Sequence, residues 1–304
     1  MHKKAARNAV KRTNAERAFD IVNTVLMVLV ALLCFYPIYF TVIASFSDPT
    51  SVVTGKVLLY PKRITLDSYK EILKYASILN GYKNTLIYTS CGTLYNLLLL
   101  IPAAYALSKK VLKGRKLLMA YFIFTMYFNG GLIPYFLQLK KLGMLNTMWV
   151  LIIPSALNVY NLIITRTFFE SSIPDALCEA AKIDGAGEFR IFVQIALPLS
   201  GAIVAVMALY HAVAHWNSYF SALLFINKPE LYPLQLVMRQ ILMTTQFQNE
   251  EMMSGLMVEE MVRRKYVAET LKYALVILAN LPIFVVYPFV QKYFVKGVMI
   301  GAIK

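Results

Sequence analysis

Charge is scarce in this sequence. Only 15% of its 304 residues are Asp, Glu, Lys or Arg, whereas a soluble domain averages about 25%. Hydrophobic residues make up 59%, and the mean hydropathy is +0.58. Water is therefore not the only solvent of this chain.

Several motifs that mark energy use or catalysis are missing. There is no Gly-x-x-x-x-Gly-Lys-Ser/Thr phosphate loop, so a pump built on this chain would take its energy from another chain. Apart from His211 and His215, the long apolar runs hold no acid or base, which argues against a proton-coupled carrier. No hydrolytic triad or carboxylate pair gathers in one place, and we predict no catalytic residues.

Cysteine is also rare. Cys34, Cys91 and Cys178 form an odd set without a Cys-x-x-Cys pair, so they predict neither a disulfide framework nor a metal site and are interpreted as small apolar fillers. His211 and His215 are four residues apart, a spacing that can hold a metal. No Glu lies between them and no third ligand is near in sequence, so we predict no metal.

The uncharged runs predict the fold class. Each reaches the roughly 18–20 residues that cross a ~30 Å hydrocarbon core as a helix, and no alternating strand segments occur. We predict an all-α, polytopic membrane protein with six transmembrane helices in the runs 21–47, 84–108, 117–139, 142–165, 191–227 and 273–291.

Two runs need a closer definition. The first is longer than the 7–15 apolar residues of a signal peptide and has no clear cleavage site, so it is interpreted as a retained anchor. The fifth is too long for one span. Residues 191–196 are expected to finish the preceding polar segment, and the membrane helix is expected to begin at Leu197-Pro198, since Pro loses no hydrogen bond in a first turn.

The distribution of positive charge predicts the topology. The net charge is +15, but its basic residues flank the apolar runs, which indicates the cytoplasmic face rather than nucleic-acid binding. We expect a basic cytosolic segment at 1–20, a domain at 21–304, and both termini in the cytoplasm. The clusters are Lys3, Lys4, Arg7, Lys11, Arg12 and Arg17; Lys109, Lys110, Lys113, Arg115 and Lys116; and Lys292, Lys296 and Lys304.

Two long segments, about 48–83 and 228–272, are expected outside the cell. They also carry basic residues, partly offset by acids, and long loops follow the charge rule less strictly. A capping residue, early acids and helical spacing predict a short amphipathic helix over 65–73. The Met-rich segment 245–268 is expected to form another helix. It is either a docking surface for an external partner or a solvated loop.

A short polar segment, about 171–196, separates the fourth and fifth runs. Ser172 or Asp175 is expected to cap a helix that Gly185 and Gly187 end. A second amphipathic piece follows with Phe189, Phe192, Val193 and Ile195. We expect a helical hairpin whose small residues Ala180, Ala181 and Ala186 let another backbone approach. The residues alone leave an ordinary loop as the alternative.

Polar residues at membrane depth are candidates for a substrate pathway. Asparagines there join helices more often than they bind solute, and aromatics near a span end commonly form an interfacial belt. The candidates are Asn129, Asn158, Asn161, His215, Trp216 and Asn217.

The polar segment also carries a familiar pattern. Glu179-Ala-Ala-x-x-Asp-Gly-Ala with Leu197-Pro198 resembles the signature loop of permease subunits of ATP-binding-cassette (ABC) importers. The resemblance covers nearly all of residues 20–304. Within this family the chain is similar to the carbohydrate permeases of the maltose type. Tyr127-Phe-Asn-Gly-Gly-Leu-Ile-Pro134 and the tail 291–297 resemble a subgroup associated with complex oligosaccharides.

The resemblance implies a type I ABC importer permease in a bacterial plasma membrane. Such a chain forms a heterodimer with a second permease subunit, receives oligosaccharide from an extracellular solute-binding protein, and contacts cytosolic ATPase subunits that bind ATP and Mg. It carries no cofactor and is no enzyme. The implied ATPase-coupling residues are Glu179, Ala180, Ala181, Asp184, Gly185 and Ala186.

Two alternatives remain. One is an importer of the same type for a peptide or a polyol, because the loop motif fits every solute equally. The other is an ion-coupled carrier or a membrane enzyme, which would lack ATPase and permease partners.

Overall fold

The computed structural model of the chain describes residues 13–251, 265–285 and 288. Regular structure in these residues is helical, which confirms the all-α prediction. The chain divides into two compact units, Met1–Lys70 with Gly255–Ile277 and Glu71–Ser254 with Leu278–Lys304, called unit 1 and unit 2 below. Residues 1–12 of the basic N-terminal segment, the clusters at 292–304 and the tail motif lie outside the described residues.

Unit 1 is built on one long helix. α1 (Asn14–Ser45) begins with a capping box, in which Thr13 and Glu16 each accept a hydrogen bond from the other's backbone N–H. Its large apolar side chains are mostly exposed, as suits a helix whose solvent is lipid. The C-terminal end of α1 packs with α2 (Pro49–Val53) and the helix Lys265–Val285, where Tyr273 lies edge-on to Phe40 at 5.7 Å.

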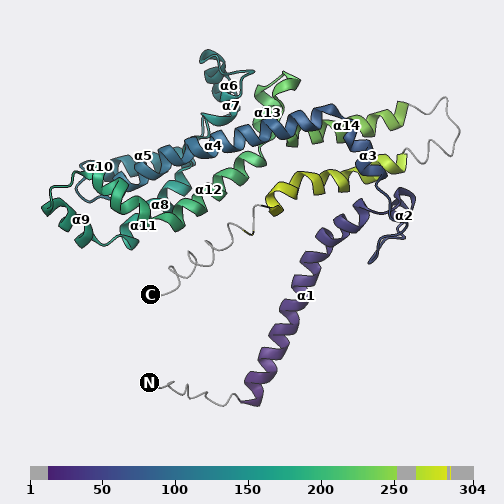
Figure 1. Cartoon of the computed structure of the whole chain (residues 1–304), viewed down its shortest axis with the longest axis horizontal. Coiled ribbons are helices and arrows are strands. Elements are labelled where there is room, and N and C mark those ends of the chain that lie inside the picture. Colours follow the sequence, from purple (N-terminus) through teal and green to yellow (C-terminus); the bar gives the residue numbers. More distant parts are fainter. Residues whose placement is uncertain (1–12, 252–264, 286–287, 289–304) are drawn as a thin grey trace. The chain divides into compact units, whose positions relative to one another are not determined.

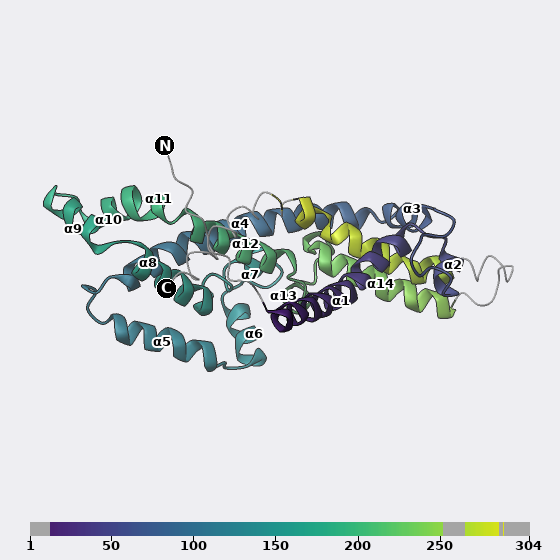
Figure 2. The same cartoon turned by 90° about the horizontal axis from the view of Figure 1, so that it is seen from below.

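α4 (Ala76–Ser108) is the central helix of unit 2 and lies beside α8, α12 and α14 (Figures 1 and 2). Asn84 donates hydrogen bonds to the carbonyls of Glu230 and Tyr232, and a Cβ on Gly81 would lie 3.1 Å from Leu234 Cα. Amide side chains and small residues on one helix therefore bring the neighbouring backbone close.

The other elements of unit 2 that follow α4 in the sequence are all shorter than α4. They are α5 (Arg115–Tyr127), α6 (Leu132–Lys141), α7 (Trp149–Ile152), α8 (Val159–Ser172), α9 (Asp175–Ile183), α10 (Glu188–Ile191), a π-helix (Phe192–Ala196), α11 (Leu197–Leu199), α12 (Gly201–Trp216), α13 (Phe220–Phe225), a 3-10 helix (Pro229–Leu231) and α14 (Leu234–Glu251).

The described residues hold three continuous helices long and apolar enough to cross a membrane: Asn14–Ser45, Ala76–Ser108 and Lys265–Val285. Two bent pairs bring the number to five, Arg115–Tyr127 with Leu132–Lys141 (112°) and Glu188–Leu199 with Gly201–Trp216 (80°). The predicted count of six is not confirmed.

Local turn chemistry explains why the uncharged runs are not all single helices. Asn129 accepts a hydrogen bond from Gly131 N, and Gly131 has φ +89°, which breaks the third run between α5 and α6. Asn158 caps α8 through Asn161 N and so divides the fourth run between α7 and α8. In the fifth run Pro198 does lie in the first turn of α11, but the chain bends at Ser200 and α12 begins at Gly201.

The helices expected in the two long segments are present where the structure describes them. α3 (Asp67–Leu73) follows Thr65, whose hydroxyl accepts from Asp67 N. Residues 245–251 belong to the end of α14, and 265–268 begin the next helix. Residues 252–264 lie outside the described residues.

Candidate functional site

α9 and α10 form the two arms of the predicted hairpin. α9 starts after Pro174, which makes no side-chain cap, so the expected caps Ser172 and Asp175 are wrong. Pro fixes a suitable φ there, and Asp175 instead adds negative charge to the first turn. Lys182 and Glu188 connect the arms with an ion pair of 2.6 Å, and the hydrogen bond and charge of Glu188 raise the pKa of Lys182 above its ordinary value.

α9 ends in a Schellman motif. Gly185 has φ +82°, Gly185 N donates to Lys182 O at 3.0 Å, and Ala186 N donates to Ala181 O at 2.9 Å. The prediction that Gly185 ends the helix is confirmed. Gly187 has φ −73° and starts α10 instead of ending α9.

Of the four residues expected on the apolar face of the second arm, Phe192 and Ile195 do pack against the buried cluster, but Phe189 and Val193 do not. Ile191 and Ala196 are fully buried, whereas Phe189 is 78% exposed and Val193 is also exposed. A π-helical stretch, Phe192–Ala196, shifts the helical register, so the 3.6-residue period used for the prediction does not apply.

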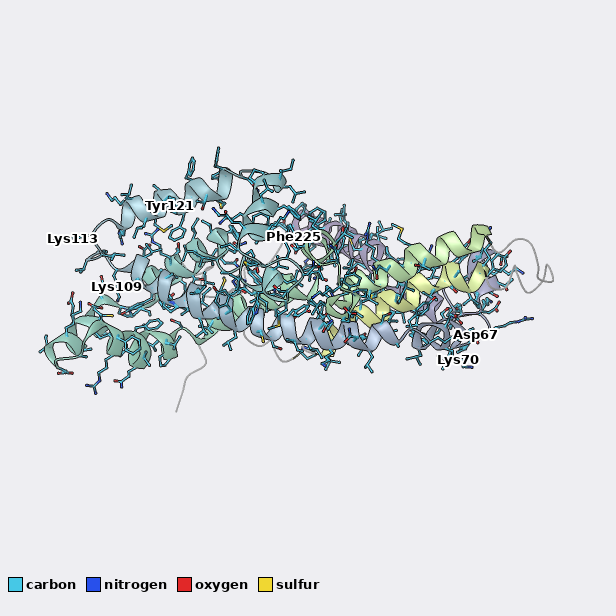
Figure 3. All side chains as sticks on the ribbon, turned by 90° about the horizontal axis from the view of Figure 1, so that it is seen from above. Asp67, Lys70, Lys109, Lys113, Tyr121 and Phe225 are labelled. Atoms are coloured by element: carbon cyan, nitrogen blue, oxygen red, sulfur yellow. The ribbon has the colours of Figure 1, made fainter. Side chains whose placement is uncertain are left out.

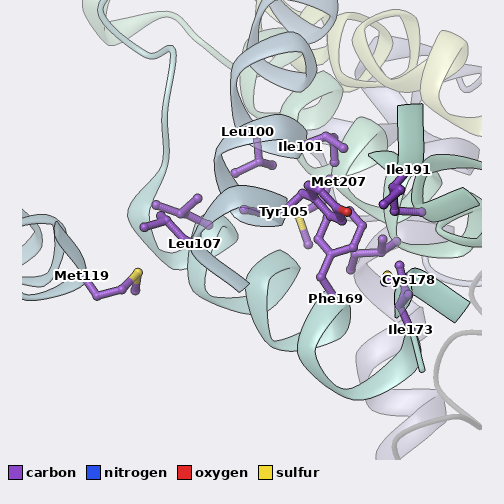
Figure 4. Packing of buried hydrophobic residues seen from close by; sticks show 14 residues of the cluster. Leu100, Ile101, Tyr105, Leu107, Met119, Phe169, Ile173, Cys178, Ile191 and Met207 are labelled. Carbon is purple, nitrogen blue, oxygen red and sulfur yellow. The ribbon is translucent and has the colours of Figure 1, made fainter. Parts of the chain in front are cut away.

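α9 has one anchored face and one open face. Cys178 is buried, and Ala181 and Ala186 pack against the same apolar cluster, which Figure 4 shows with Tyr105 beside Phe169. Glu179, Ala180 and Asp184 are exposed, as is Ile183, which is 87% exposed. The exposed residues 176, 179, 180 and 183 share one side of the helix by their spacing.

Two lysines connect α9 to the end of α4. Lys109, labelled in Figure 3, donates to Cys178 Sγ at 3.3 Å and lies 4.5 Å above the Tyr105 ring. Partial burial opposes the charge of Lys109, but its contacts with Tyr105 and Cys178 outweigh burial and raise its pKa. Lys110 pairs with Asp175 at 3.5 Å. The buried Cys178 is thus more than an apolar filler.

A cluster of three charged side chains, the arginine clamp, holds the same end of α4. Arg166 donates to Leu107 O at 3.1 Å, and Arg115 donates to Ser108 O at 3.2 Å. Both guanidinium groups also bind one carboxylate oxygen of Glu170, at 2.6 and 3.2 Å. Positive charge at a helix C-terminus is favourable, so the clamp fastens α5 and α8 to α4. Sequence reasoning missed it, although the i,i+4 spacing of Arg166 and Glu170 was a signal.

A cavity of about 240 Å³ lies between α6, α7, α8 and α12. Of the predicted pathway residues, Asn158, Asn161 and His215 are brought together here. The complete lining is Tyr135, Val150, Leu151, Pro154, Ser155, Asn158, Asn161, Tyr210, His211, Ala214, His215, Ser218 and Ser221.

The other three predicted pathway residues do not line this cavity. Asn129 forms the turn before α6, Trp216 is buried and donates to Ala279 O at 3.0 Å, and Asn217 is exposed and donates to Val213 O. Each is hydrogen-bonded to a backbone group, and of these three bonds that of Trp216 joins two helices.

Hydrogen bonds from α4 and α8 hold the two histidines of the cavity. Asn96 donates to the carbonyls of Ser155 and Ala156, so its own carbonyl oxygen faces His215 Nε2 at 2.8 Å. Because that oxygen only accepts, Nε2 of His215 carries the hydrogen. The amide of Asn161 meets His211 Nε2 at 3.3 Å.

The comparison with known proteins covers both the α9–α10 hairpin and the cavity. Residues 97–300 match the family described as the inner membrane component of binding-protein-dependent transport systems. The chain belongs to this family. The matched residues of this transport component include α9, the arginine clamp and every residue that lines the cavity.

Curated relatives match over nearly their whole length. The chain is 38% identical over 299 residues to Protein LplC of Bacillus subtilis, with 98% of each chain covered. It is also 38% identical over 291 residues to the polygalacturonan/rhamnogalacturonan transport system permease protein YtcP of the same organism, with 95% of this chain and 99% of YtcP covered.

A solved structure shares the fold of this transport component. It is described as the crystal structure of a bacterial ABC transporter involved in the import of the acidic polysaccharide alginate. The two align with a TM-score of 0.82 and 33% identity, covering 94% of this chain and 100% of the other. The predicted fold of an ABC importer permease is therefore confirmed.

Proposed function

We propose that this chain is the membrane-spanning permease subunit of an ATP-driven, binding-protein-dependent importer of oligosaccharides, and that it is not itself an enzyme. The solute class is supported by the family and by similar proteins whose names give transport of polygalacturonan, galactooligosaccharides or alginate. One observation supports the coupling role above all: α9 is anchored on one face and leaves Glu179, Ala180 and Ile183 open on the other.

In this proposal the open face of α9 binds a cytosolic ATPase subunit. Glu179 supplies a charge for a basic group of the partner, and Ala180 lets the partner's backbone approach. Ala181, Asp184, Gly185 and Ala186 shape the helix end that the ATPase holds. ATP and Mg bind to the partner, and both termini of this chain lie in the cytoplasm.

Motion then has a route into the membrane. A push on α9 reaches α4 through Cys178–Lys109 and Asp175–Lys110, and the arginine clamp makes α5 and α8 follow. α4 carries Asn96 and α8 carries Asn161, so the same movement reaches the cavity. Alternating access requires such a two-state element that nucleotide and solute both bias.

The remaining partners follow from the surface. The exposed apolar side chains of α1 and α5 are suited to lipid and to a second permease subunit. An extracellular solute-binding protein delivers the sugar. On this chain, the proposed contacts of the sugar are Asn158, Asn161 and His215.

Purification of the chain from its native membrane, in detergent and without crosslinker, tests the proposal. An ATPase subunit and a second permease are expected in the complex, and vesicles containing it take up oligosaccharide only with ATP and binding protein. Uptake driven by an ion gradient, or a chain that purifies alone, would contradict the proposal. Uptake of a peptide or a polyol in place of sugar would contradict only the solute class.

A further inference from the structure

The cavity between α6, α7, α8 and α12 has an uncharged lining. Among the described residues that form it there is no Asp, Glu, Lys or Arg; serine hydroxyls, two amides, two imidazoles and two tyrosines supply its polar groups. Hydroxyls and amides both donate and accept hydrogen bonds, as sugar hydroxyls do. The lining therefore matches a ligand that is rich in hydroxyl groups and carries no net charge.

The cavity is too small for a whole oligosaccharide. Its volume is about 240 Å³, below the roughly 300–1,000 Å³ of pockets that hold drug-sized ligands. The rings of Tyr135 and Tyr210 border it from α6 and α12, and aromatic side chains combine an apolar face with a polar group. A pyranose offers the complement, an apolar C–H face and a rim of hydroxyls.

The neutral His215 ring offers a carboxylate no hydrogen-bond donor. Asn96 accepts the hydrogen on Nε2, so in the neutral ring Nδ1 is an acceptor. A sugar hydroxyl can donate to it, whereas a carboxylate, which only accepts, cannot. A carboxylate that enters this cavity loses its hydration, and the lining described above has no guanidinium or ammonium group to replace it.

We propose that this cavity is a subsite for one uncharged pyranose unit of the transported oligosaccharide, and that it rejects uronate units. The proposal rests on the proposed function and adds a charge preference to it. Acidic units of a mixed oligosaccharide would then be held outside this cavity, by the partner subunit or by another part of the pathway.

Protection from alkylation tests the subsite in the purified complex in lipid nanodiscs. Ser221→Cys and Ser218→Cys each place a thiol in the lining, and an uncharged maleimide labels it; mass spectrometry of the peptide separates it from Cys34 and Cys91, which are exposed. The probes are three matched pairs: galactose and galacturonate, mannose and mannuronate, glucose and glucuronate. Labelling at Cys34 in the same sample is the control for nonspecific effects.

At least one neutral sugar is expected to slow labelling at residue 221 or 218. The matching uronate should need a concentration at least about tenfold higher for the same protection, since the loss of one hydrogen bond weakens binding by roughly that factor. Equal or better protection by the uronate overturns the charge preference. Absence of labelling, or of protection by every neutral sugar, overturns the subsite. ATP-driven uptake by the same variants reports separately on the proposed function, so the two failures are distinguishable.

Discussion

The imidazole of His215 occupies the space in which a side chain on Gly92 would lie. A Cβ at residue 92 would come within 2.5 Å of two atoms of the ring, closer than side chains pack in real proteins. α4 and α12 can therefore approach here because residue 92 has no side chain. The same approach brings His215 to Asn96.

Gly92→Ala is expected to destabilise the chain. Alanine gains up to about 1 kcal/mol of helix propensity, but overpacking costs about 1–3 kcal/mol and the displaced ring loses a hydrogen bond worth about 1 kcal/mol. The net loss lowers the melting temperature of the detergent-purified complex. Gly201→Ala is the matched control, because a Cβ there meets nothing within 4 Å. An unchanged melting temperature for Gly92→Ala would show that the ring does not fill this space.

Local patterns in the sequence were enough to predict the all-α class and the end of α9 at Gly185. These features depend on neighbours in the chain. A glycine that needs positive φ and a helix of about twenty apolar residues are both readable within one window of sequence.

Contacts between distant segments could not be predicted. His215 meets Asn96 across 119 residues and Arg115 meets Glu170 across 55, and no single-sequence pattern links such positions. The bends at Gly131 and Ser200 were missed for another reason: an uncharged run reports hydrophobicity, whereas a bend depends on backbone hydrogen bonds such as that from Gly131 N to Asn129.

Gly185→Ala is expected to weaken the coupling segment through the backbone alone. A Cβ at 185 meets nothing within 4 Å, but φ +82° is strained for alanine and costs about 1 kcal/mol. The end of α9 then frays, and less ATPase subunit is retained on the purified complex. Gly187→Ala is the control, since Gly187 has open space and φ −73°. Equal retention by the two variants would argue against a role for the Schellman motif.

Glu170→Gln is expected to loosen the arginine clamp. Arg115 and Arg166 lose their shared carboxylate but keep their bonds to the carbonyls of α4. Since these side chains are 21–31% exposed, screening limits the loss in stability to about 1 kcal/mol. The larger expected effect is functional: ATP hydrolysis persists while sugar uptake per ATP falls.

The control for the clamp is Glu71→Gln, which removes the carboxylate partner of Lys74, an exposed ion pair outside the hairpin and the clamp. Uptake and ATP hydrolysis are measured in the same vesicles, so that a loss of protein lowers both and a loss of coupling lowers only their ratio. An unchanged ratio for Glu170→Gln would mean that α8 and α4 move together without this carboxylate.

Glu179→Lys is expected to uncouple transport while leaving the chain in the membrane. Glu179 is exposed on the open face of α9, so its replacement disturbs no packing within this chain, and surface substitutions of this kind change stability by roughly 0.5 kcal/mol or less. Reversing its charge would place like charges together if the ATPase presents a basic group. Membrane content, measured by immunoblot, should match the unsubstituted chain while ATP-dependent uptake is lost. Glu179→Gln, which removes the charge without reversing it, should retain part of the uptake. Full uptake by Glu179→Lys would remove Glu179 from the coupling contact and leave Ala180 and Ile183 as the face to test.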